Sequence, residues 1–91
     1  MDKLSDARKK IDEIDKEMAR LFEERMAVVR DIAEFKKENG LKIYDMAREN
    51  EVVEKNAKLV SDPMLREYYV SFLKENMAIS RRYQERLFEK T

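Results

Sequence analysis

The chain has 91 residues, of which 43% are hydrophobic and 44% are charged, and its 20 Lys and Arg balance its 20 Asp and Glu. This length suits one domain with a modest core, and the two charge signs interleave, whereas nucleic-acid binding needs clustered Lys and Arg. There is no His and no Cys, so the usual zinc ligands, thiolates and neutral-pH proton shuttles are missing. If the chain is an enzyme, we expect its reaction to need neither a nucleophile nor a metal.

The longest unbroken apolar run covers only residues 26–29, and the first ten residues lack the apolar core of a signal peptide. We therefore expect no membrane span and no export signal. Absence of cysteine is typical of a reducing compartment, so we expect a cytoplasmic protein.

The first predicted element is a helix over about residues 2–38, in which apolar residues keep a heptad rhythm. One seam consists of Leu4, Ile11, Met18, Arg25 and Ile32, and the other consists of Ala7, Ile14, Leu21, Val28 and Phe35. Gly40 provides the stop signal. A helix of about 35 residues is roughly 50 Å long, but a compact monomer of this size has a radius of gyration of only about 12 Å. The helix must project beyond its own core, and pairing with a second copy about a two-fold axis would cover its seams.

Two further helices are expected. The second covers about residues 45–60, with Asp45 as N-cap. The third covers about residues 63–90, with Asp62 as N-cap and Pro63 in the first helical position. The sequence thus predicts a single all-α domain over residues 1–91, with three helices per chain in a homodimer. A long coiled-coil rod is the simpler alternative, but two shorter helices of packing length argue against it.

Charged residues stand where the core of the first helix should be. Arg25 occupies a seam, which costs stability unless the charge is paired or meets a ligand. Lys36 follows after 11 residues, about 20° of helical phase and roughly 16 Å of rise, so the two cations share a face. Arg8 has the same heptad position as Lys36 but lies about 42 Å away. In an antiparallel pair of first helices, however, Arg8 of the partner chain would lie beside this stretch.

The second and third helices add polar residues of the same kind. Asp45, Arg48 and Glu49 share one face of the second helix, and Ser80 and Gln84 lie one turn apart on the third. Each has an ordinary interpretation by itself: a solvated edge, a cap, a local ion pair of little energetic value or a boundary polar residue. Taken jointly, the charged and polar residues predict a buried pocket lined by Arg, Lys, Arg, Glu and Gln on three helices, with room for a small anion.

This set of residues resembles the all-helical AroQ class of chorismate mutases, most closely the bacterial type. The resemblance covers the segments "ARKKIDEIDKEM", "ERMAVVRDIAEFK" and "IYDMARENEVVE", the last of which contains D-x-x-R-E at residues 45–49. Eight residue types recur in order at fixed intervals. The residues that match are Arg8, Arg25, Lys36, Asp45, Arg48, Glu49, Ser80 and Gln84.

The resemblance implies an intertwined homodimer in which each active site is completed by an arginine of the partner chain. It implies rearrangement of chorismate to prephenate, in the biosynthesis of phenylalanine and tyrosine, without a cofactor or a metal. The related isochorismate-pyruvate lyases share the fold and several cations, so they are an alternative. A helical dimerisation module without enzymatic activity is a second alternative.

The resemblance also implies a role for each residue. Arg8 of the partner chain and Arg25 would hold the substrate carboxylates, assisted by Arg48 and Ser80, because the planar guanidinium binds a carboxylate through two hydrogen bonds. The ether oxygen, where negative charge develops, would accept hydrogen bonds from Lys36 and Gln84.

The ring hydroxyl of the substrate would be received by Glu49 and by the backbone near Asp45. The residues expected to act in catalysis are Lys36, Gln84, Arg25 and Glu49.

Overall fold

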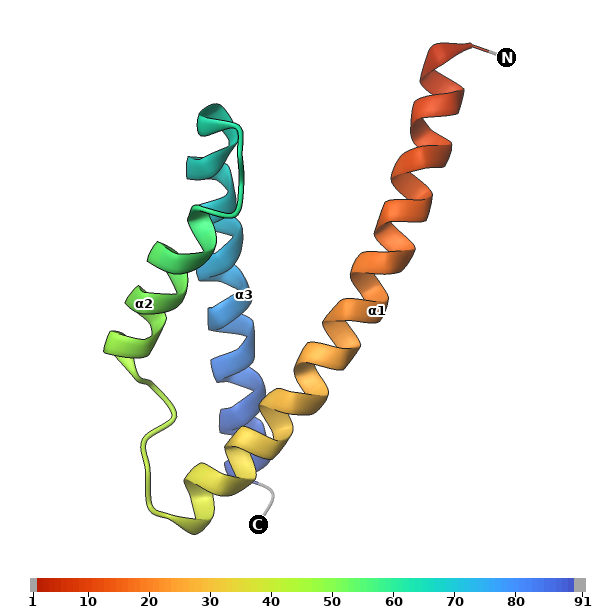
Figure 1. Ribbon diagram of the computed structural model, residues 1–91. Helices are drawn as coiled ribbons and strands as arrows, with labels where there is room; N and C mark the ends of the chain where they lie inside the picture. The colour runs from red at the N-terminus through yellow and green to blue at the C-terminus, as the bar shows by residue number, and fades with distance from the viewer. Residues whose placement is uncertain (1, 90–91) are drawn as a thin grey trace.

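The computed structural model describes residues 2–89 and contains three helices, α1 (Lys3–Glu38), α2 (Met46–Ala57) and α3 (Pro63–Glu89), with no strand in this range. The helices α2 and α3 run side by side, whereas α1 leans away from them toward its N-terminal end (Figure 1). The expected all-α class with one very long helix is confirmed. The expected end of the third helix near residue 90 lies outside the described residues.

The end of α1 is built around the one glycine of the chain. Gly40 has a φ of 64°, in the left-handed region that glycine adopts without strain. Its N–H donates to the carbonyl of Lys37, and the N–H of Leu41 donates to the carbonyl of Lys36 at 2.8 Å. These two bonds form a Schellman motif, which satisfies the last carbonyls of the helix and confirms the predicted stop.

The starts of α2 and α3 follow the predicted caps. Asp45 is the N-cap of α2, and its side chain accepts a hydrogen bond of 3.0 Å from the backbone N–H of Arg48. The helix ends at Ala57, about three residues earlier than expected. Pro63 disfavours a helical conformation of the residue before it, and the Asp62 carboxylate accepts from the N–H of Met64 at 2.9 Å. The chain therefore leaves one helix and caps the next within residues 58–62.

The core is small and lies where α3 crosses the C-terminal part of α1. Its buried apolar residues are Val29 and Ala33 on α1 and Leu73 and Met77 on α3. In the described range α3 contacts both other helices, but α1 and α2 do not pack against each other. The third helix is thus the element on which the other two are placed.

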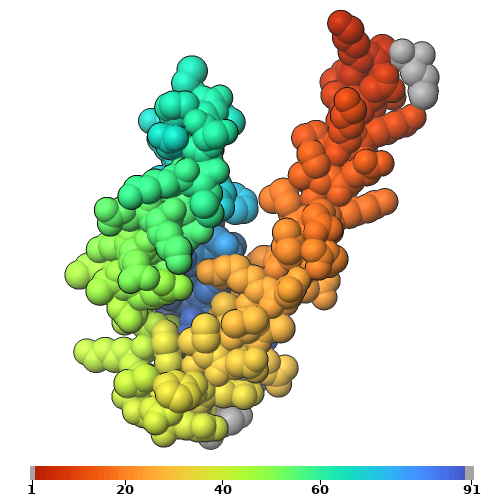
Figure 2. Space-filling model, viewed as in Figure 1, coloured from red at the N-terminus to blue at the C-terminus, as the bar shows by residue number. Residues whose placement is uncertain are grey.

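The N-terminal part of α1 projects beyond this core (Figure 2). The molecule measures 56 × 28 × 14 Å, and its radius of gyration is 16.5 Å, well above the roughly 12 Å of a compact chain of this length. The apolar seam residues have exposed fractions between 44% and 60%: Leu4, Ile11, Ile14, Met18, Leu21, Val28, Ile32 and Phe35. Neither seam supplies the residues buried against α3. No helix within residues 2–89 has the length and apolar character required to span a membrane.

Candidate functional site

A short stretch of α3, residues 80–84, joins the other two helices. Ser80, which is 6% exposed, accepts a hydrogen bond of 2.5 Å from Nη1 of Arg25 on α1. The Ser80 hydroxyl in turn donates to the backbone carbonyl of Asn76 at 3.0 Å. The seam position of Arg25 is therefore explained within the chain, because its guanidinium leaves the seam and reaches a buried hydroxyl on α3.

Gln84 lies one helical turn after Ser80 on the same face of α3. It is 6% exposed, and its side-chain carbonyl Oε1 has no hydrogen-bond partner within residues 2–89. A buried polar atom without a partner costs free energy and is uncommon in folded proteins. The Oε1 atom can accept a hydrogen bond from a bound molecule that carries a donor.

Lys36 lies in the last turn of α1 and is half-buried. Its Nζ donates a hydrogen bond of 2.7 Å to the backbone carbonyl of Ile43 in the α1–α2 connection. The Lys36 side chain thus extends past the turn at Gly40 to reach the α1–α2 connection. The ammonium keeps two further donors, which remain available for a ligand.

Glu49 on α2 forms an ion pair with Arg81 on α3. The side chains are only 21% and 30% exposed, respectively. The Arg81 guanidinium also stacks over the ring of Tyr44, 5.0 Å from its centroid. The hydrogen bond to Glu49 raises the pKa of Arg81 above its ordinary value.

Sequence reasoning missed Arg81. In the sequence it stands beside Arg82 in a charged segment and resembles an ordinary solvated residue. A signal was nevertheless present, because Arg81 lies between Ser80 and Gln84, which were both predicted to be site residues.

Three of the predicted site residues stand apart from this cluster in the single chain. Asp45 serves as the helix cap. Arg48 is exposed and pairs with Glu51 at 2.5 Å on the surface of α2. Arg8 is exposed on the projecting part of α1, about 42 Å along the helix from Lys36.

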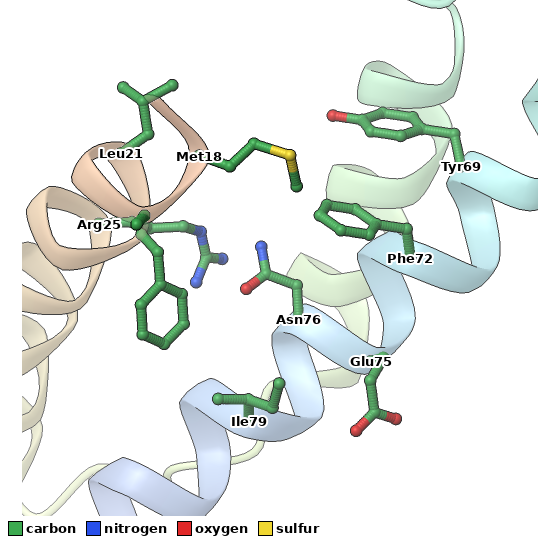
Figure 3. A pocket seen from close by; sticks show the side chains of 10 residues that line it. Met18, Leu21, Arg25, Tyr69, Phe72, Glu75, Asn76 and Ile79 are labelled. Atoms are coloured by element: carbon green, nitrogen blue, oxygen red, sulfur yellow. The ribbon is translucent and has the colours of Figure 1, made fainter. Parts of the chain in front are cut away.

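A groove of about 790 Å³ lies between the middle of α1 and α3. Its lining is mostly apolar and consists of Met18, Ala19, Leu21, Phe22, Arg25, Tyr69, Phe72, Glu75, Asn76 and Ile79. Figure 3 shows the Arg25 guanidinium and the Asn76 amide directed toward each other across the groove. Lys36, Glu49 and Gln84 do not line it. Of the predicted site residues of this chain, only Arg25 borders the groove.

The chemistry that these residues offer is limited to binding and hydrogen bonding. Residues 80–84 of α3 carry a buried hydroxyl, a buried amide and the cation Arg81, and they contact Arg25 of α1 and Glu49 of α2. No group of three or more acidic residues within residues 2–89 is placed to hold a metal ion. Cationic and neutral donors of this kind suit an anionic ligand with carboxylate and hydroxyl groups.

Comparison with known proteins gives a consistent result. The family model described as "Chorismate mutase type II" matches residues 7–85. A curated protein named "Chorismate mutase", from Methanocaldococcus jannaschii, is 32% identical over 90 residues, which cover 93% of this chain and 91% of that protein. No solved structure matches the chain significantly.

Proposed function

Because the chain belongs to the chorismate mutase type II family, it is an isomerase that converts chorismate to prephenate, and we propose that the reaction takes place beside residues 80–84 of α3. Prephenate is the precursor from which phenylalanine and tyrosine are made. Neither the family model nor the relative favours a lyase or a non-enzymatic dimerisation module.

The observation that carries the proposed location is the buried Gln84 amide: its carbonyl has no partner in the described chain, and its NH2 group is the part that could donate to a ligand oxygen. One turn before Gln84 on α3, Ser80 holds Arg25, and at the end of α1 the carbonyl of Ile43 holds Lys36. These side chains are already oriented, which lowers the reorganisation needed when charge develops in the transition state.

The reaction is a [3,3]-sigmatropic rearrangement, in which one C–O bond breaks as one C–C bond forms. No proton moves and no covalent intermediate with the protein is required. Negative charge grows on the ether oxygen as the C–O bond lengthens. Donors at Lys36 and Gln84 would bind that oxygen more tightly in the transition state than in the substrate, and this difference lowers the barrier.

The remaining residues bind and shape the substrate in this proposal. Arg25 takes one carboxylate, with Ser80 holding its guanidinium. Glu49 and the backbone near Asp45 take the ring hydroxyl. Holding the enolpyruvyl arm over the ring removes orientational freedom before the reaction, which contributes to the rate.

We further propose that the second substrate carboxylate is bound by Arg8 of a partner chain. The open seams of α1 and the apolar groove beside Arg25 support a homodimer about a two-fold axis, since both would otherwise leave large apolar surfaces in water. In an antiparallel pair of α1 helices, the N-terminal end of one reaches the C-terminal part of the other. Arg48, which pairs with a surface glutamate in the single chain, would turn toward the substrate when it binds.

The direct test is to follow the loss of chorismate absorbance and to identify the product. Prephenate is the expected product, formed without added metal or cofactor. Formation of pyruvate and salicylate from isochorismate, with no prephenate from chorismate, would contradict the proposal and identify a lyase.

A further inference from the structure

The ion pair between Glu49 and Arg81 is distinct from the other ion pairs described in residues 2–89. Those on α1 and α2 join residues three or four positions apart, and the one on α3 joins Arg82 to Glu75; in all of them both side chains are more than half exposed. Such surface pairs contribute little to stability. The Glu49–Arg81 pair joins two helices, and its members are only 21% and 30% exposed.

The geometry leaves half of the Glu49 carboxylate open. Arg81 donates from Nη1 to Oε1 of Glu49, and within residues 2–89 no side chain or backbone group donates to Oε2. An ionised carboxylate accepts hydrogen bonds on both oxygens. The pair can therefore fix the plane of the carboxylate through one oxygen and present the other to a hydroxyl group.

Arg81 also contacts the segment that holds Lys36. Its guanidinium lies over the ring of Tyr44, and the preceding residue, Ile43, supplies the carbonyl to which Lys36 donates. A cation above an aromatic face is attracted by the ring. Arg81 thus contacts Glu49 directly, and it also contacts Tyr44, the residue next to the one that accepts the hydrogen bond of Lys36.

We propose that Arg81 is a positioning residue that orients Glu49 so that its free oxygen accepts the ring hydroxyl of chorismate. The inference rests on the proposed function and adds to it a residue that acts through Glu49 and does not touch the substrate. Arg81 holds one oxygen of the carboxylate, and the Tyr44 ring limits the directions that the guanidinium can take.

The experiment compares chorismate with an analogue in which the ring hydroxyl is replaced by hydrogen. In Arg81→Met, which keeps much of the length but removes the charge, kcat/KM on chorismate should fall about 10- to 100-fold, the range for a hydrogen bond to a charged group. On the analogue, which has no hydroxyl to offer, the fall should be less than about threefold. Arg81→Lys should recover part of the loss on chorismate, because the charge is kept and the planar fork is not.

Two controls separate positioning from a general structural effect. Arg82→Met makes the same chemical change at the next residue, whose ion pair with Glu75 is exposed, and it should leave both substrates nearly unaffected. Glu49→Gln should show the same selective loss on chorismate. Adding Arg81→Met to Glu49→Gln should cost little more, because residues that act as one unit are not additive. Thermal unfolding of each variant confirms that it is folded.

Each outcome either supports or rejects the positioning role of Arg81. Equal losses on both substrates in Arg81→Met, or no loss on either, would overturn the positioning role while leaving the mutase activity intact. A selective loss in Glu49→Gln without one in Arg81→Met would keep the proposed site and reject Arg81. Failure of the unaltered chain to convert chorismate at all would overturn the proposed function and this inference together.

Discussion

Two faces of α1 carry the same kinds of residue but differ in what covers them. On one face Val29 and Ala33 pack against α3, and they are only 7% and 1% exposed. On the other face Val28, the neighbour of Val29, is 55% exposed. The packed face is short and lies beside Arg25 and Lys36, whereas the open face is apolar over almost the whole helix.

The difference teaches that the strongest apolar pattern in a sequence need not be the one that builds the core of its own chain. The heptad seams are long and regular because they suit contact with another helix over many turns. The contact with α3 needs only a few small or medium residues near the end of α1. We therefore expect the packed face to determine chemistry and the open face to determine assembly.

The largest effect should come from Lys36→Ala beside the packed face. Loss of a charged donor to the ether oxygen should reduce transition-state stabilisation by about 3–5 kcal/mol, measured from kcat/KM. The protein should keep its helical content and its size in solution. Turnover close to that of the unaltered protein would remove Lys36 from the mechanism and leave the packed face without its main catalytic group.

Gln84→Glu tests the part of the proposed site that α3 contributes, through the pH dependence of activity. The glutamine amide is a donor at every pH, so activity of the unaltered protein should be nearly flat around neutrality. Only a protonated glutamate can donate, and above its pKa the protonated fraction falls tenfold per pH unit. For a carboxyl pKa of about 5 or lower, activity of the variant should therefore fall about 100-fold from about pH 6 to about pH 8. A flat profile for the variant would show that Gln84 is not the donor.

Val28→Ala measures whether the open face is covered in solution. Removing two buried carbon groups costs about 1.5 kcal/mol of unfolding free energy, which is the loss expected for Val29→Ala on the packed face. If a partner chain covers Val28, Val28→Ala should cost a similar amount, and the midpoint of unfolding should rise with protein concentration. A cost below about 0.5 kcal/mol, as for an exposed residue, would contradict the homodimer.

The smallest change, and the most specific, comes from mixing two defective proteins. Arg8→Ala and Lys36→Ala homodimers should each be nearly inactive. Refolded together in equal amounts, they should form about half heterodimers by random pairing, and one of the two sites in each heterodimer receives neither defect. Activity should then recover to about a quarter of the unaltered value per site. With heterodimers verified by mass spectrometry, the lack of any recovery would reject a site that takes Arg8 from one chain and Lys36 from the other.

The helix ends were predictable from the sequence because they depend on local chemistry. The Gly40 stop, the Asp45 cap and the Pro63 start each need only a few neighbouring residues, and the structure has all three. The end of α2 was placed too late because Leu59 and Val60 continue an apolar pattern. Leu59 is 74% exposed, so this residue gains little packing that would extend the helix beyond Ala57.

The tertiary contacts were less predictable. The buried stripe of Val29 and Ala33 was overlooked because a small residue such as Ala33 gives a weak pattern beside long seams. The partners of Arg25 and Glu49 lie 55 and 32 residues away along the chain. Their pairing depends on how α3 crosses α1 and α2, which no local spacing encodes. The grouping of Arg25 with Ser80 was expected only from the family resemblance.

The unbroken course of α1 from Lys3 to Glu38 limits how the chain can change in length. Inserting one residue between Arg25 and Lys36 would rotate everything after it by about 100° and shift it by about 1.5 Å, which would carry Lys36 off the face that it shares with Arg25. An insertion within residues 58–62 alters only a connection that contains none of the proposed site residues. Related sequences should therefore differ in length between α2 and α3 and keep the spacing within α1 constant.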